Sequence, residues 1–120
     1  MSEKDFQNYK AASDAGMMVA IAKTFFFTEF WRELQESSKV KSLRPKDLEM
    51  LRRHLKEAVA AMDDNMFFFP PDVAGSEAEL RKSINSRFAD SVSRRNLLKE
   101  LQRRLDSESP TLFSSLGIEG

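Results

Sequence analysis

The stretch MMVAIAKTFFFTEFW, residues 17–31, is the longest apolar run of this 120-residue chain. When residues 17–34 are placed on a helix, their apolar side chains cover most of its circumference, and a helix that is apolar all round is buried. We therefore predict a central buried helix over residues 17–36. Lys23 and Glu29 interrupt the run, which is also shorter than the about 20 apolar residues that a membrane span needs, so we expect no contact with a membrane.

Amphipathic helices are predicted on the C-terminal side of this segment, over residues 45–66, 77–90 and 93–106. Pro45 suits the first position of a helix, and apolar residues recur at helical spacing from Leu48 to Met66. Ser76 and Glu79 have the spacing of a capping box. Strand signals are nearly absent. We predict an all-α fold, a compact bundle of four to five helices that forms one domain over residues 1–120.

The two ends of the chain are predicted to be short and peripheral, over residues 1–16 and 107–120. A helix starts near Lys4 and leads toward Ala12. One helix over residues 4–37 would be about 51 Å long at 1.5 Å per residue, too long for a compact domain of this size. Unless the chain dimerises through such a helix, we expect a break near Gly16, where Ser13 and Asp14 compete with the helix for backbone hydrogen bonds. Another short turn is predicted over residues 109–117.

Composition excludes many kinds of active site. The chain has no cysteine, four glycines and one histidine, so disulfides, zinc–cysteine clusters and glycine-rich phosphate loops are excluded. His54 is expected to be an ordinary surface or boundary residue, and Glu29 and Glu33 to lie on a solvated helix face. We therefore expect no catalytic residue, metal site or cofactor, and a protein that is not an enzyme. The lack of cysteine and of a secretory signal favours a cytoplasmic location.

Two phenylalanine triplets, Phe25–Phe27 and Phe67–Phe69, are the first feature that could carry binding. The first triplet is expected in the core. The second precedes Pro70 and Pro71, so its rings either plug the end of the bundle or form a contact surface. The candidate partner-binding residues are Phe67, Phe68, Phe69 and Val73. The leading hypothesis is a small adaptor or regulatory protein that binds another protein, and a homodimer that covers the apolar helix is compatible with it.

A basic segment is the second such feature. Between Arg81 and Arg104 there are eight basic and two acidic residues, although the whole chain has 19 of each kind and no net charge. The candidate anion-binding or nucleic-acid-binding residues are Arg94, Arg95, Lys99, Arg103 and Arg104. Nucleic-acid binding through this face is the alternative function, while a solvated face balanced by acids of neighbouring helices needs no function. A third hypothesis is a carrier of apolar ligands, with a cavity lined by Met17, Met18, Met62 and Met66.

Overall fold

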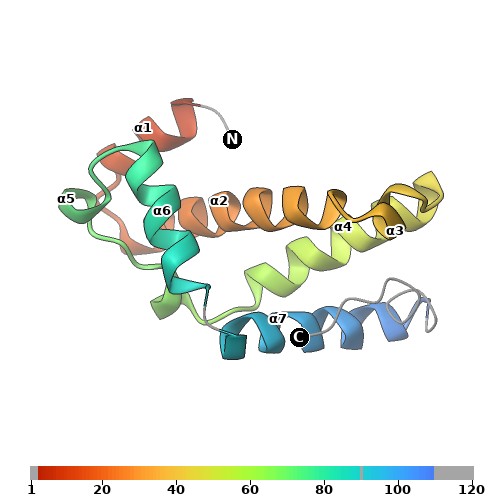
Figure 1. Cartoon of the computed structure of the whole chain (residues 1–120). Coiled ribbons are helices and arrows are strands. Elements are labelled where there is room, and N and C mark those ends of the chain that lie inside the picture. Colours follow the sequence, from red (N-terminus) through yellow and green to blue (C-terminus); the bar gives the residue numbers. More distant parts are fainter. Residues whose placement is uncertain (1–2, 90, 110–120) are drawn as a thin grey trace.

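The computed structural model describes residues 3–89 and 91–109, and within them the chain forms helices and no strand (Figure 1). The elements in chain order are α1 (Glu3–Ala11), α2 (Ala15–Gln35), α3 (Ser38–Lys41), α4 (Pro45–Ala60), the 3₁₀ turn η1 (Asp64–Phe67), α5 (Pro71–Ala74), α6 (Glu77–Arg87) and α7 (Ser91–Asp106). The prediction of an all-α fold is confirmed. Five of these helices have nine or more residues, in agreement with the predicted four to five.

Helix α2 lies at the centre of the molecule, as predicted. It contacts α1, α3, α4, η1 and α6, and Figure 1 shows it running along the length of the molecule beside α4. The buried side chains of α2 are Met18, Val19, Ala22, Phe25, Phe26, Phe30 and Leu34. The enclosure is incomplete, because Met17 is 49% exposed. None of the helices in the described part of the chain is both long enough and apolar enough to span a bilayer.

The chain breaks between α1 and α2, so residues 4–37 form two helices. Asp14 ends the break as the N-cap of α2, and its side chain accepts a hydrogen bond of 2.8 Å from the Gly16 N–H. The expectation that residues 1–16 are peripheral is wrong for α1, because its Tyr9 is fully buried in the core. The spacing of three residues between Phe6 and Tyr9 indicated that this helix has an apolar face. It did not indicate which part of the molecule that face packs against.

Helix α4 begins at Pro45 as predicted but ends at Ala60, six residues before the predicted Met66. The Lys23 Nζ donates to the carbonyls of Ala60, at 2.9 Å, and Met62, at 2.7 Å. These carbonyls have lost their helical partners, so the ammonium from α2 satisfies them. The Asp63 side chain then accepts from the Asn65 N–H at 3.0 Å and starts η1.

Helices α6 and α7 complete the bundle. Ser76 accepts the Glu79 N–H at 3.2 Å, which confirms the Ser76 half of the predicted capping box, whereas the Ser76 N–H donates to the Ala74 carbonyl. Helix α6 ends at Arg87 and α7 starts at Ser91, close to the predicted limits. Helix α7 packs against α4, and its buried residues are Leu97, Leu98, Leu101 and Leu105. The molecule measures 43 × 25 × 21 Å. Most of the turn predicted over 109–117 lies outside the described residues.

Candidate protein-interaction site

The loop that carries the second phenylalanine triplet alternates between core and solvent. Phe67 and Phe69 are buried, whereas Phe68 is 42% exposed and Val73 is 57% exposed. The expectation that all four residues form a contact surface is therefore wrong for Phe67 and Phe69. The physical reason is the extended backbone at Phe68, with φ −84° and ψ 117°, because successive side chains of an extended chain point in opposite directions.

Phe67 closes an aromatic cluster between η1, α2 and α6. Its ring centroid lies 5.6 Å from that of Phe26 and 4.7 Å from that of Phe88, and the Phe26 and Phe88 centroids are 4.4 Å apart. The Lys23 ammonium lies 5.5 Å from the Phe67 centroid. This arrangement corresponds to the plug at the end of the bundle that the sequence offered as one alternative for the triplet.

Phe69 is held from two sides. The Arg87 guanidinium lies 4.1 Å from its ring centroid, a distance at which a cation is attracted to the face of the ring. The Tyr9 hydroxyl donates a hydrogen bond to the Phe69 carbonyl. Tyr9 comes from α1 and Arg87 from the end of α6, so two helices that are far apart in sequence fix one residue of the loop.

The exposed Phe68 thus lies on a fixed backbone. Arg87 Nη1 donates to the carbonyls of Met66, at 3.0 Å, and Phe68, at 3.1 Å, and the next carbonyl accepts from Tyr9. Further along, Lys10 Nζ donates to the Gly75 carbonyl at 2.8 Å, where α5 ends with a left-handed φ of 58°. Side chains of α1 and α6 therefore hold both ends of the segment between η1 and α6, and Phe68 points outward from it.

The state of Tyr9 gives a direct test of this arrangement. Burial raises the pKa of Tyr9 to about 12, while the Arg87 charge acts in the opposite direction. Tyr9 is the only tyrosine of the chain, so absorbance at the tyrosinate wavelength reports this residue alone. We expect a transition near pH 12 in the folded protein and near pH 10 in denaturant.

The same titration predicts how stability depends on pH. A folded-state pKa above the unfolded value contributes stability that is fully present below about pH 10 and is lost as the pH rises to about 12, about 3 kcal/mol in all. Tyr9→Phe should lack this loss when unfolding is measured across that interval. A tyrosine transition near pH 10 in the folded protein would contradict the buried position.

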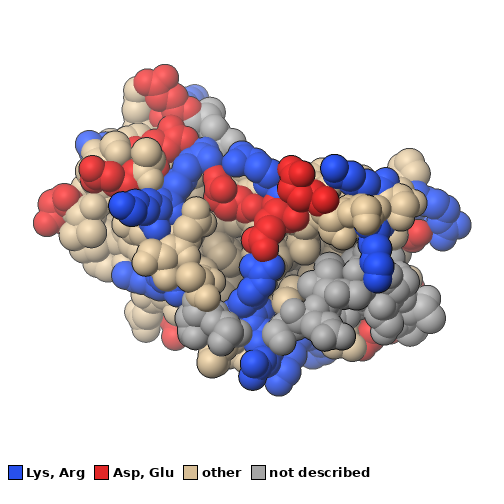
Figure 2. Space-filling model, viewed as in Figure 1, with Lys and Arg blue, Asp and Glu red and all other residues tan. Residues whose placement is uncertain are grey.

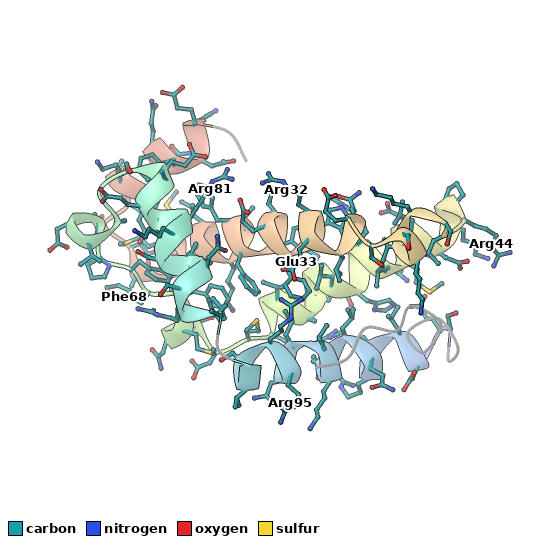
Figure 3. The ribbon with its side chains drawn as sticks, in the orientation of Figure 1. Arg32, Glu33, Arg44, Phe68, Arg81 and Arg95 are labelled. Atoms are coloured by element: carbon teal, nitrogen blue, oxygen red, sulfur yellow. The ribbon has the colours of Figure 1, made fainter. Side chains whose placement is uncertain are left out.

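The basic residues of α7 divide into two groups. Arg94 pairs with Glu33 of α2, Arg104 lies 3.3 Å from Glu57 of α4, and Arg103 donates to Glu100 at 2.6 Å. The hydrogen bond from Arg103 lowers the pKa of Glu100. Among the described residues Arg95 and Lys99 are exposed and form no ion pair, and Figure 3 shows Arg95 on the outer side of α7. Of the five predicted residues, only these two have no carboxylate partner among the described residues.

Acidic side chains of α2 account for part of this neutralisation. Figure 2 shows acidic groups over the middle of the visible face, with lysines and arginines on both sides. Glu29 lies 2.5 Å from Arg81 of α6 and 3.5 Å from Arg32. Glu29 and Glu33 thus join α2 to α6 and α7 through ion pairs, a role that the prediction of a solvated face did not include.

A basic end of the molecule was missed from the sequence. Four cationic residues lie in the run from Lys39 to Lys46, which contains no acidic residue. Of the four, Arg44 pairs with Asp47 at 3.0 Å, and the three lysines have no ion pair among the described residues. Figure 3 places Arg44 at the end of the molecule opposite Phe68. The charge run itself was the signal that could have identified this surface.

Several hollows lie on the surface of the described residues. One of them, of about 390 Å³, lies between α2, α6 and α7 and has an aromatic floor and an ion-paired rim. Of the methionines expected to line a ligand cavity, Met62 and Met66 line a hollow of about 380 Å³ beside α7, whereas Met18 is buried in the core. Within the described residues no group of three or more potential metal-binding side chains occurs.

His54 is not the surface or boundary residue that the sequence suggested. Its side chain is only 7% exposed, because α7 packs against α4 and Glu108 lies beside the imidazole. The prediction relied on the basic residues Arg53 and Lys56, which flank His54 in the sequence and suggested the outer side of the helix. Adjacent residues of a helix point in different directions, so these residues did not show where His54 faces.

No protein-family model, no curated protein and no solved structure matches this chain.

Proposed function

We propose that this chain is a small non-enzymatic adaptor or regulatory protein that binds another protein through the loop at Phe68. The observation that carries the proposal is a large apolar ring exposed between two buried ones, on a backbone whose carbonyls are held by Arg87 and Tyr9. Val73, exposed on the same segment, adds apolar area for contact.

Association is weakened by the entropy lost when loops and side chains become ordered. A loop that is already fixed loses little of it. Aromatic side chains, phenylalanine included, are enriched at protein interfaces, and loops positioned by a rigid scaffold commonly carry function. Phe68 combines these properties, since exposure of its ring in the free protein leaves apolar area to be buried by a partner.

The test is affinity capture from the source lysate, followed by measurement of affinity for the captured protein. We expect Phe68→Ser to weaken binding by about 2 kcal/mol or more, roughly 30-fold, with unchanged helicity and stability. Arg44→Ser is the control, since Arg44 is exposed at the opposite end of the molecule. Equal binding by wild type and Phe68→Ser, or equal loss in the control, would contradict a role for this loop.

The nucleic-acid alternative now depends on Arg95 and Lys99. Binding governed by phosphates needs several unpaired cations and falls steeply with salt, and the other three residues of this face are engaged by carboxylates. Nuclease treatment in the same capture experiment separates the two functions. Loss of capture after nuclease treatment would favour nucleic acid over protein as the partner.

A second copy of the chain is a further partner within this proposal, because exposed residues without charge follow one another at helical spacing on α2. Met17, Ala20 and Thr24 are exposed along it. The hydroxyls of Thr24 and Thr28 donate to carbonyls of their own helix, each at 2.9 Å, so they add little polarity to this side. Light scattering on the full chain measures the oligomeric state directly.

A further inference from the structure

A hollow of about 370 Å³ lies between α2 and α4, two helices that run side by side (Figure 1). Its volume falls within the range of about 300–1,000 Å³ that is usual for small-molecule sites, which are lined mostly by apolar side chains with a few polar groups. The apolar side chains of this hollow come from both helices and are those of Val19, Ala20, Phe27, Val59 and Ala60. The hollow therefore has the size and the lining of a site for a ligand that is largely apolar.

The part of the lining that α2 supplies follows one face of the helix over about three turns. Its residues recur at intervals of three or four from Gly16 to Phe27, and such positions lie on one side of a helix. The two ends of this face are about 16 Å apart at 1.5 Å per residue. Thr24 supplies a hydroxyl there, which donates to the Ala20 carbonyl at 2.9 Å and so is already satisfied. An elongated apolar chain fits this shape better than a compact ligand does.

Two lysines and one carboxylate supply the charge of the hollow, namely Lys23, Lys56 and Asp64. The Lys23 ammonium has three donors. Two are used by backbone carbonyls at the end of α4, and the third is used by Asp64 Oδ1 at 2.7 Å. Lys56 is exposed and forms no ion pair within the described part of the chain. The lining thus has one positive charge in excess, and Lys56 carries it.

This charge favours an anionic group on the ligand. A carboxylate that enters the hollow gives Lys56 a partner, and the apolar walls exclude water from one side of the contact, which strengthens it. Lys23 can share its third donor, because Asp64 is 74% exposed and an ion pair with an exposed partner contributes little stability. A second copy of the chain fits less well, since a symmetric interface would bring two hollows of the same charge together.

We propose that this hollow binds a linear fatty acid of medium length. The apolar chain lies along α2 against Val19 and Val59, and the carboxylate pairs with the Lys56 ammonium. The hollow shares no residue with the segment that carries Phe68 and Val73. The site is therefore independent of the proposed function, and it can be occupied while a protein partner is bound.

The experiment is isothermal titration calorimetry of the full chain with decanoate, below the concentration at which it forms micelles and at about pH 7.5, where its carboxylate is ionised. Decanol, which has the same chain without the charge, is the comparison. We expect decanoate to bind about tenfold more tightly than decanol, the factor that one hydrogen bond to a charged group supplies. NMR of the same samples should show shifts of the Ala20 and Ala60 amide signals, which report the two walls of the hollow.

Variants separate the charge of the site from its apolar space. Lys56→Gln should bind decanoate no more tightly than decanol, whereas Ala20→Leu places a larger side chain in the hollow and should weaken both ligands by about tenfold or more. Asp64→Asn removes the competing charge but keeps an acceptor for Lys23, so decanoate should bind about threefold more tightly. Lys46→Gln, on α4 but outside the hollow, is the matched control and should bind like the wild type.

Equal affinity of the wild type for decanoate and decanol, or an unchanged preference in Lys56→Gln, would overturn the proposal. A dimer in light scattering that Ala20→Leu converts to a monomer would also overturn it, because a second copy would then cover the hollow. Phe68→Ser should retain decanoate binding, which keeps this result separate from the capture of a protein partner.

Discussion

Replacing Phe67 with alanine is expected to lower the free energy of unfolding by about 3–5 kcal/mol, the range found for buried aromatic residues. The ring is fully buried and contacts Phe26, Phe88 and the Lys23 ammonium. Its removal leaves a cavity where η1, α2 and α6 meet, and rigid helices collapse into such a space only in part. Denaturant unfolding followed by far-ultraviolet circular dichroism measures the change.

The neighbouring ring provides the matched control. Phe68→Ala removes the same atoms from a position that is exposed, so we expect a change within about 0.5 kcal/mol, as for other surface substitutions. Comparison of Phe67→Ala with Phe68→Ala distinguishes a residue that stabilises the core from an adjacent residue that is proposed to bind a partner. Equal destabilisation by both variants would mean that the loop does not alternate between core and solvent, and would remove the basis for a role of Phe68 in binding.

Replacing Tyr9 with alanine is the second large effect that we expect, again about 3–5 kcal/mol from the loss of a buried ring. The substitution also leaves the Phe69 carbonyl without its donor. Tyr9→Phe retains the ring and removes only the hydroxyl, which should cost about 1–3 kcal/mol, the range for leaving a buried polar group unsatisfied. The difference between the variants separates packing from hydrogen bonding.

The control for Tyr9 is its exposed neighbour on the same helix. Asn8→Ala should change the free energy of unfolding by no more than about 0.5 kcal/mol, since Asn8 is exposed. If Tyr9→Ala were equally mild, α1 would be a peripheral helix, as the sequence first suggested, and it could not fix the loop. A separate capture experiment with Tyr9→Phe, at a temperature where this variant is folded, shows whether loss of the hydrogen bond to the Phe69 carbonyl weakens partner binding.

Some of the site could be predicted from sequence because its cause is local. The proline pair marked residues 67–73 as a loop, and helical spacing marked α4 and α7. The direction of each ring in the triplet could not be predicted in this way. It depends on Tyr9 and Arg87, which lie 60 residues before and 18 residues after Phe69 in the chain and act on its carbonyl and its ring.

The basic face of α7 shows the same limit. The sequence displays the cations at helical spacing, but their partners Glu33 and Glu57 come from α2 and α4. Residues that are distant along the chain neutralise Arg94 and Arg104, so the count of charges in one segment overestimated what is available to an anion. The end of α4 was misplaced for a similar reason, since Lys23 of α2 satisfies the carbonyls there.

By itself the sequence determined the helical class, the central apolar helix and the cap at Ser76, because periodicity, backbone preferences and capping act within a few residues. Only the tertiary structure decided that Phe68 is exposed between two buried rings, that α1 belongs to the core and that His54 is buried. Burial and pairing are properties of contacts between distant segments, and such contacts exist only once the helices have packed.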